Sequence, residues 1–206
     1  MSARSGVQWI VAFFFMAAGL SSPVLAGPTI TYGGDFDLPI PASGDPESEY
    51  GRGWMDDAVI DIGDHFTIND LDVGITLRHT SVFDLQIFVE SPAGTLLCLN
   101  MYNFDEFFKG EDYEDTIFDD EAALSIEEGH PPFTGRFRPR SPAELSVFDG
   151  QDTFGQWRLR IYDAYYYDTG TLESFEVIIT VCEPGTATLL ILGVAFLALF
   201  KPRWGC

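Results

Sequence analysis

Residues 71–94 read LDVGITLRHTSVFDLQIFVESPAG, and two runs of alternating apolar residues within them decide the fold class. Apolar side chains occupy every second position of Leu71–Leu77, with His79 in phase, and again every second position of Leu85–Val89. A period of two is typical of a β-strand with one buried and one solvated face. Two such runs separated by a short turn predict consecutive antiparallel strands, and Ser91–Gly94 supplies the turn residues that end the second. The stretch therefore reads as the middle of a β-sandwich.

The last third of the chain shows the same alternation. Apolar and polar residues alternate in Trp157–Tyr162 and in Phe175–Val181, with a turn predicted at Asp168–Gly170. Shorter strand candidates are Thr29–Tyr32, Ala58–Ile60 and Thr95–Leu99. Eight or nine short strands with no helical periodicity between the two ends predict an all-β fold, a jelly-roll β-sandwich.

The N-terminal residues have the pattern of an export signal. Arg4 precedes the apolar run Val7–Leu20, and Val24–Ala26 suits signal-peptidase cleavage after Ala26. We therefore expect residues 1–26 to be a signal peptide, with an uncleaved anchor as the alternative. The folded domain would then span residues 27–181.

The C-terminal residues predict a hydrophobic helix. Ala187–Phe200 carries no charge and is followed by Lys201 and Arg203, an arrangement that suits a membrane tail with its basic end in the cytoplasm. At about 1.5 Å per residue this run spans roughly 21 Å, less than the ~30 Å of a hydrocarbon core, so a buried core helix is the alternative.

The residues just before this run resemble a sorting signal. Cys182, Glu183 and Pro184 are similar to the Pro-Glu-Pro of PEP-CTERM signals, with Cys182 in place of the first proline. That resemblance implies that residues 182–206 are a sorting tail processed by an exosortase-type enzyme, and that the protein is exported and held at the cell envelope.

Charge and cysteine content narrow the choice of partners. The chain of 206 residues has a net charge of −21 at pH 7, which opposes binding to nucleic acid or to an anionic membrane surface. Three cysteines do not make a disulfide scaffold, and whether Cys98 and Cys182 form a bridge is left open.

The most acidic part of the chain is Asp105–Glu128. Ca²⁺ prefers carboxylate and carbonyl oxygens and tolerates irregular loops, so Asp115, Asp119 and Asp120 are candidate calcium ligands. The alternative is a solvated acidic surface, salt-bridged to the arginines that alternate along Phe133–Pro142.

Catalytic motifs are weak or absent in the sequence. Asp168-Thr169-Gly170 matches the tripeptide of aspartic proteases, but it occurs once, between two predicted strands, where aspartate and glycine favour a turn. The sequence has no Gly-x-Ser-x-Gly motif and no zinc-ligand spacing such as Cys-x-x-Cys. We therefore predict no enzymatic activity, and a peptidase dependent on Asp168 is a minor alternative.

Tyr165, Tyr166 and Tyr167 form an aromatic cluster beside Asp163 and Asp168. Exposed aromatic rings can stack on sugars, so these tyrosines are candidate ligand-binding residues. Ordinary surface rings are the alternative.

Several motifs in order resemble the P domain (P/Homo B domain) of kexin- and furin-like proprotein convertases, in its bacterial form. The resemblance covers about Phe66 to Val181. It is carried by V-x-I-x-L-R-H-T, by D-L-x-I-x-V-x-S-P-A-G-T, and by Asp115–Asp120, Pro132–Gly135, Gly155–Trp157 and Asp168–Leu172. It implies a galactose-binding-like sandwich and places Asp84 and Asp163 among the possible calcium ligands.

In convertases the P domain packs against the protease domain and stabilises it. The resemblance thus implies a non-catalytic binding or structural module, or an accessory to a subtilisin-like protease, with a protein at the cell surface as partner. The alternative is a calcium-assisted carbohydrate-binding module for an extracellular polysaccharide, resting on the tyrosine cluster.

Overall fold

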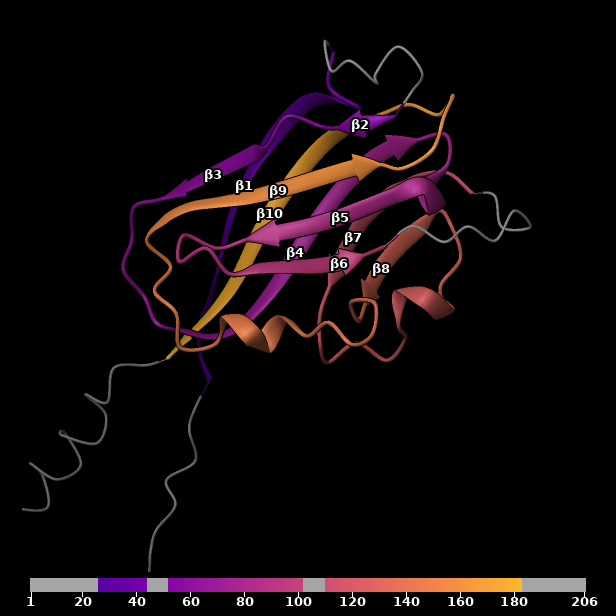
Figure 1. Ribbon diagram of the computed structural model, residues 1–206. Helices are drawn as coiled ribbons and strands as arrows, with labels where there is room; N and C mark the ends of the chain where they lie inside the picture. Colours follow the sequence, from indigo (N-terminus) through magenta and orange to yellow (C-terminus); the bar gives the residue numbers. More distant parts are fainter. Residues whose placement is uncertain (1–25, 44–51, 102–109, 183–206) are drawn as a thin grey trace, which may run out of the picture.

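The computed structural model describes residues 26–43, 52–101 and 110–182 (Figure 1). They form two β-sheets and three short 3₁₀ helices, with no α-helix in these ranges. The strands are β1 (Ala26–Ile40), β2 (Gly53–Trp54), β3 (Ala58–Ile62), β4 (Ile68–His79), β5 (Leu85–Glu90), β6 (Leu96–Asn100), β7 (Tyr113–Phe118), β8 (Phe133–Phe137), β9 (Gly155–Asp163) and β10 (Gly170–Cys182). The 3₁₀ helices are η2 (Val82–Asp84), η3 (Ile126–Glu128) and η4 (Leu145–Phe148).

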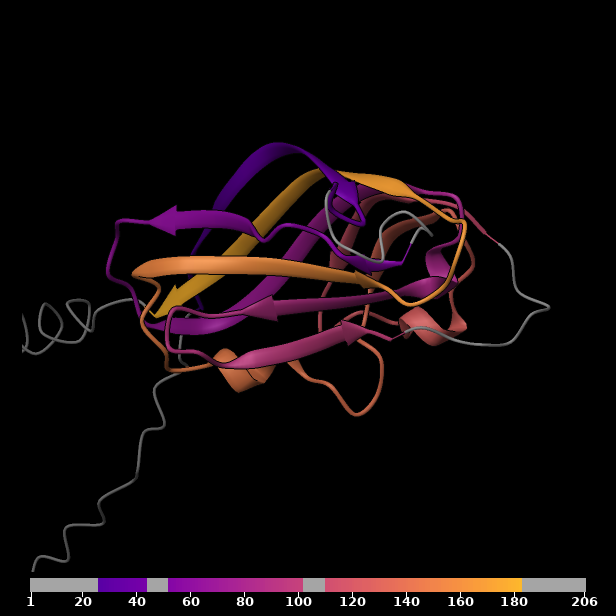
Figure 2. The same ribbon diagram turned by 45° about the horizontal axis from the view of Figure 1, so that its top comes forward.

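The two sheets lie face to face. Sheet A has the strand order β1-β10-β4-β7-β8, and sheet B has the order β2-β9-β5-β6, with β3 also paired to β9 (Figures 1 and 2). All pairs are antiparallel except β7 with β8, which is parallel. The predicted all-β sandwich is confirmed, while its jelly-roll connectivity stays a prediction.

The strands β4 and β5 form where the alternation predicts them, but they do not pair with each other. β4 lies between β10 and β7 in sheet A, and β5 lies between β9 and β6 in sheet B. The segment that contains η2 carries the chain from one sheet to the other, so the prediction of an adjacent pair is wrong.

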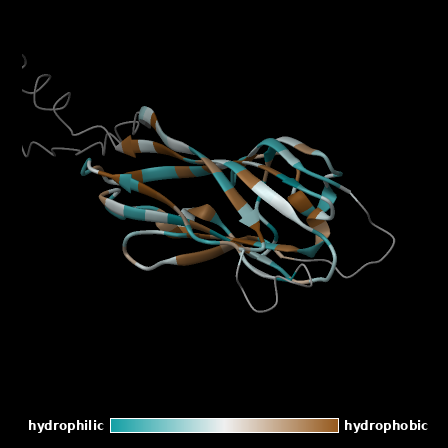
Figure 3. Cartoon of the chain, turned by 90° about the horizontal axis from the view of Figure 1, so that it is seen from above, coloured by the Kyte–Doolittle hydropathy of each residue, from teal (hydrophilic) through white to brown (hydrophobic). Residues whose placement is uncertain are grey.

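The core fills the space between the sheets. In β9 Trp157, Leu159 and Ile161 are buried, and between them Arg158 and Arg160 point outward. The Trp157 indole Nε1–H donates to the Thr153 carbonyl at 3.0 Å, so this buried ring keeps a hydrogen bond. Figure 3 shows the same alternation as bands of opposite hydropathy along the strands. Each large apolar side chain buried in this way contributes roughly 1.5–3 kcal/mol.

Other strand predictions need correction. The first strand is far longer than Thr29–Tyr32, because β1 pairs with β10 from Ala26 to Ile40. The acidic segment is partly regular, since β7 and η3 lie within it. Cys98 is a free, half-buried thiol.

Both ends of the described chain lie at one end of the sandwich, because Ala26 of β1 pairs with Cys182 of β10 (Figures 1 and 2). Residues 1–25 of the predicted signal peptide and the predicted hydrophobic helix, together with Glu183 and Pro184, lie outside the described residues, while Ala26 begins β1. Within those residues no helix has the length and apolar character needed to cross a bilayer.

Candidate functional site

The end of the sandwich opposite to Ala26 and Cys182 gathers polar side chains. There β4 ends at His79, β9 ends at Asp163 and β10 begins at Gly170. Gly170 pairs with His79, and Asp163 pairs with Leu85 at the start of β5. Strands of both sheets therefore bring their ends together at this point.

His79 and Asp163 form a fully buried pair at the centre of this site. Both side chains are 0% exposed, and the His79 Nε2 lies 3.0 Å from the Asp163 Oδ2. The His79 Nδ1 lies 2.9 Å from the Ser81 carbonyl, and the other Asp163 oxygen accepts from the Tyr165 amide at 3.1 Å. Burial raises the pKa of Asp163, although His79 and the Tyr165 amide favour its charged form. The prediction that His79 lies on the buried face of its strand is confirmed.

Asp84 brings a second carboxyl group next to this pair. Burial raises the pKa of Asp84, a hydrogen bond with Ser81 lowers it, and the nearby charges of Asp163 and Asp168 raise it further. Asp168 in turn accepts a hydrogen bond from the Thr80 hydroxyl at 2.8 Å. Two predicted calcium ligands, Asp84 and Asp163, therefore lie near each other, and Asp168 joins them.

The remaining predicted ligands lie elsewhere and have other partners. Asp115 is exposed in a bulge of β7, with φ of 47° and a 3.4 Å hydrogen bond from Thr76. Asp119 binds Arg136 at 2.6 Å. Asp120 accepts the Leu145 and Ser146 amides, each at 2.9 Å, at the start of η4.

The five predicted ligands thus do not form one cluster. Among the described residues, no three carboxylate, imidazole or thiol groups are placed so that they could hold a metal ion. A cation at Asp84 and Asp168 would have to draw its remaining ligands from backbone carbonyls or water, which Ca²⁺ accepts. The carboxylates of Asp119 and Asp120 do not fit such a site, because a guanidinium and two amides already hold them.

Arg136 links the acidic segment to β4. Its Nη1 lies 2.7 Å from the Asp72 carboxylate and 2.6 Å from the Asp119 carboxylate. Burial alone would raise the pKa of Asp119, but hydrogen bonds from Arg136 and from the Glu121 amide hold it below its usual value. Arg138 and Arg140 also have acidic partners, Glu128 and Glu127 respectively. The alternative of a salt-bridged surface is therefore confirmed for these three arginines.

The Asp168-Thr169-Gly170 tripeptide joins β10 to the end of β4. The amide of Thr80 donates to the Thr169 carbonyl at 3.2 Å, and the Thr169 amide donates to the Thr80 hydroxyl at 3.2 Å. A Cβ atom on Gly170 would collide with the Arg78 carbonyl and lie 2.5 Å from the His79 Cδ2. Glycine is therefore required here by the close approach of the strands. The bend of this connection lies at Tyr165–Tyr167, before the predicted turn at Asp168–Gly170, and Gly170 already belongs to β10.

The three tyrosines project from the loop between β9 and β10. Tyr167 is 88% exposed and has φ of 75°, an uncommon conformation for a large residue. Successive rings lie 6.3 Å apart and are tilted by 58° and 52°, so they do not share one plane. The Arg52 guanidinium lies 5.7 Å from the centre of the Tyr166 ring.

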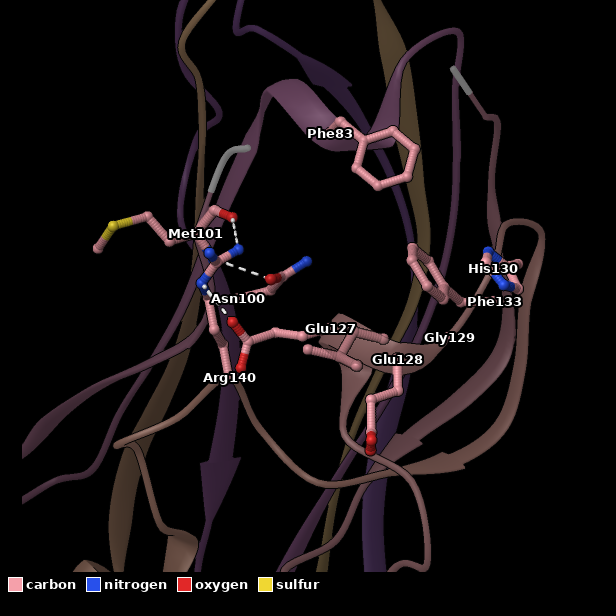
Figure 4. A pocket seen from close by; sticks show the side chains of 10 residues that line it. Phe83, Asn100, Met101, Glu127, Glu128, Gly129, His130, Phe133 and Arg140 are labelled. Atoms are coloured by element: carbon pink, nitrogen blue, oxygen red, sulfur yellow. Dashed lines mark hydrogen bonds and ion pairs between the residues drawn. The ribbon is translucent and has the colours of Figure 1, made fainter. Parts of the chain in front are cut away.

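A pocket of about 340 Å³ lies beside η3, a feature that sequence reasoning missed (Figure 4). Phe83 and Phe133 form one wall, and Met101 and Arg140 form another. Arg140 donates to the Met101 carbonyl at 3.2 Å and lies 3.4 Å from Glu127, so its charge is already compensated. Among the lining residues that the structure describes, none is a serine, threonine or cysteine that could act as a nucleophile. Sequence reasoning also missed β2, because a two-residue strand leaves no period to detect.

Comparison with known proteins identifies the domain. The family model of the proprotein convertase P-domain matches residues 68–179, more than half of the chain. The match includes β4 through most of β10, and with them His79, Asp84 and Asp163. No curated protein sequence matches the chain.

Two solved structures match part of this chain. A serine protease of Aeromonas sobria in complex with its chaperone (ORF2) has a TM-score of 0.46 at 17% identity, over 77% of this chain and 28% of that one. A second structure of the Aeromonas sobria serine protease has a TM-score of 0.43 at 16% identity, over 75% of this chain and 27% of that one. The chain thus spans little more than a quarter of the length of these proteases.

Proposed function

Because the chain belongs to the family of the proprotein convertase P-domain, we propose that it is an accessory module for a subtilisin-like protease. The P domain is the non-catalytic part of such convertases, and it acts by binding the protease domain. The observation that carries the proposal is the family match over residues 68–179, which spans both sheets of the sandwich. On this proposal the chain binds and stabilises its partner and cleaves no peptide bond itself.

The polar groups at the strand ends support a structural role for this site. Asp163 and His79 are completely buried, so no substrate atom could reach them without unfolding of the strand ends. Asp168 is bonded to Thr80 within a strand junction. These side chains fix the positions of β4, β9 and β10, which a module with a rigid binding surface requires.

Two measurements test this proposal together. The full chain is incubated with a broad peptide library, and it is co-expressed with the catalytic domain of a subtilisin-like protease from the same organism that lacks a P domain. We expect no peptide turnover by the chain alone and a higher yield of active protease on co-expression. Peptide turnover that disappears in Asp168→Asn would instead support the peptidase alternative, and an unchanged yield would argue against the accessory role.

Calcium would serve the module as a structural ion. The fit is best at Asp84 and Asp168, since the charge of Asp168 contributes to the raised pKa of Asp84. A cation there would compensate two mutually repelling charges. Removal of calcium with a chelator is then expected to lower the thermal midpoint, with no matching effect of magnesium.

Carbohydrate binding is the second candidate function, and the exposure of Tyr167 favours it. A large aromatic ring held at 88% exposure in a left-handed backbone conformation contributes nothing to the core. The proposal predicts retention on an extracellular polysaccharide that is lost in the double variant Tyr165→Ala/Tyr166→Ala and in Tyr167→Ala. Equal retention of wild type and variants would rule out this site.

We further propose export and transient attachment to the envelope. Support comes from the N-terminal apolar run and from the order of Cys182-Glu183-Pro184, apolar run and basic end in the sequence. Mass spectrometry of the mature protein tests this directly, since cleavage by an exosortase-type enzyme would remove Ala187–Phe200. A mature chain that retains both apolar runs would contradict the proposed processing.

A further inference from the structure

The strand β1 forms one edge of sheet A. Among the described residues its only strand partner is β10, and the register with β10 is continuous from Thr29 to Asp35 (Figures 1 and 2). The other side of β1 therefore presents a row of backbone N–H and C=O groups that no described strand pairs with. Such a row is the template on which a further strand can be added.

The inner face of β1 is less well covered than the rest of the core. On the neighbouring β10 the core-facing Leu172, Phe175 and Val177 are all 0% exposed. The apolar side chains on the inner face of β1 pack against the same core but are only half-buried: Ile30, Tyr32, Phe36 and Leu38. The core thus reaches the surface along this edge, and covering the remaining apolar area would favour binding.

The strand β3 lies beside β1, on the same side of the sandwich. It pairs with β9 at the margin of sheet B. The Tyr32 hydroxyl donates to the Asp64 carboxylate at 2.9 Å, so the segment that follows β3 contacts the inner face of β1. We call the side of the molecule bordered by residues 26–40 and 58–67 the open edge.

The open edge carries a negative charge. Its exposed carboxylates are Asp35 and Asp37 of β1, Asp61 of β3, and Asp64. None of the described residues that border it is a lysine or an arginine. His65 lies 2.8 Å from Asp152, and Arg158 of the adjoining β9 is paired with Asp57, so neither cation neutralises these carboxylates. A basic partner is therefore favoured here.

The two faces of the open edge set different requirements for an added strand. Successive side chains of a strand point to opposite faces of the sheet. On the inner face they would lie beside Ile30, Tyr32 and Phe36, where apolar side chains fit. On the outer face they would lie beside Thr31 and Asp35, where basic side chains fit. A segment in which apolar and basic residues alternate meets both requirements.

We propose that the open edge binds an extended segment of a partner protein, in which apolar and basic residues alternate, as an additional strand of sheet A. Main-chain hydrogen bonds to β1 hold the segment, and its lysines or arginines pair with Asp35 and Asp37. A second copy of this chain fits less well, because pairing of two β1 strands would bring like charges together. The inference goes beyond the accessory function and does not depend on it.

The test measures binding of the full chain to a synthetic peptide of about ten residues in which lysine and valine alternate. One control peptide alternates glutamate and valine. The other has the same lysines and valines in two blocks, which keeps the charge and composition but removes the period of two.

Two double variants of the chain test the location of the site. Asp35→Lys/Asp37→Lys reverses the charges of the open edge. The matched control is Glu111→Lys/Glu144→Lys, which makes the same change in net charge at two exposed carboxylates outside β1 and β3. The thermal midpoint of each variant shows that it is folded.

We expect the alternating lysine-valine peptide to bind about tenfold more tightly than either control peptide. Asp35→Lys/Asp37→Lys should weaken its binding about tenfold, because attractive cross-strand pairs become repulsive. Glu111→Lys/Glu144→Lys should bind it within about threefold of wild type. Hydrogen exchange gives a second readout, since strand addition should slow the exchange of β1 amides in the complex.

Several outcomes would overturn the proposal. If the alternating and block peptides bind equally, or if both double variants weaken binding equally, the peptide is attracted by the general negative charge and the open edge is not its site. Absence of binding, or binding that leaves exchange in β1 unchanged, contradicts strand addition. If β1 amides are protected without peptide and sedimentation shows a dimer, the occupant is a second copy of the chain rather than a basic segment.

Discussion

Asp84 lies in a half-buried position between Asp163 and Asp168, and its surroundings disfavour its charge. Burial raises its pKa, and the two neighbouring carboxyl groups raise it further. Below the unfolded pKa of about 3.8 the side chain is neutral in both states and has no effect on the stability difference. As the pH rises through the raised native pKa, the native state must carry an unfavourable charge and loses stability.

We therefore predict that Asp84→Asn raises the stability of the calcium-free protein at pH 7, by under about 1 kcal/mol because water screens the site. Near pH 3 the variant and wild type should unfold alike. Added calcium should reverse the order, since only wild type keeps the carboxylate. Chemical denaturation at both pH values, with calcium and with chelator, measures all three effects. A variant that is less stable than wild type without calcium would contradict this account of Asp84.

Asp119 differs from Asp84, because its charged form is favoured in the native state. The nearby Arg136 guanidinium holds the pKa of Asp119 below its usual value. The stabilisation is present above the unfolded pKa and is lost as the pH falls through the lower, native pKa. Arg136→Met should cost about 1–2 kcal/mol at pH 7, since Asp72 and Asp119 lose a shared partner.

The difference between Arg136→Met and wild type should shrink as both carboxylates become protonated in acid. Arg158→Met is the control, because its ion pair with Asp57 is exposed and 3.8 Å long, and should cost under about 0.5 kcal/mol. If the two variants lose the same free energy of unfolding at pH 7, the bridge from Arg136 to Asp72 and Asp119 stabilises the protein no more than an exposed ion pair does.

At the scale of elements, the junction of β4 and β10 depends on Gly170. A Cβ atom there would strike the Arg78 carbonyl and crowd the His79 ring, so one strand would have to move away from the other. We predict that Gly170→Ala lowers the free energy of unfolding by about 3 kcal/mol or more, measured by urea denaturation.

The matched control is Gly63→Ala, since a Cβ atom at Gly63 meets no atom within 4 Å. It should be neutral or slightly stabilising, through the lower entropy of the unfolded chain. A Gly170→Ala variant as stable as Gly63→Ala would mean that the strand junction tolerates a side chain.

Strand periodicity predicted most of the inward-facing residues but little of their arrangement. In β9 and β10 the alternation of apolar and polar residues predicts which side chains are buried, because successive side chains of a strand point to opposite faces of the sheet. β4 pairs with β10 and β5 pairs with β9, and these partners lie far along the chain. No local sequence pattern predicts such pairing, so the sequence did not show that β4 and β5 belong to different sheets.

The candidate site was predictable in part for the same reason. Sequence spacing suggested that Asp115, Asp119 and Asp120 share a loop. In the structure Asp115 lies in a bulge of β7, Asp119 binds Arg136, and Asp120 accepts backbone amides at the start of η4. Asp84 and Asp163 are distant in sequence and meet because β5 pairs with β9. Their proximity followed from the P-domain resemblance rather than from any local signal.

At the scale of the whole molecule, the two sheets share one core but carry different side chains on their outer faces. Sheet A presents threonines and the ion-paired Arg78 to water, and sheet B presents Trp54 and Tyr162 beside the ion-paired Arg160. Both ends of the described chain leave from the end opposite to the tyrosine loop.

The central claim is that this module stabilises a subtilisin-like protease by binding it. Its most direct test is thermal unfolding of the catalytic domain, without a P domain, at increasing concentrations of the full chain. A ligand that binds only the native state raises stability by RT ln(1 + [L]/Kd), about 2.7 kcal/mol at a hundredfold excess over Kd. The account predicts a midpoint that rises by several degrees with concentration. A midpoint that stays constant at every concentration of the wild-type chain would contradict it.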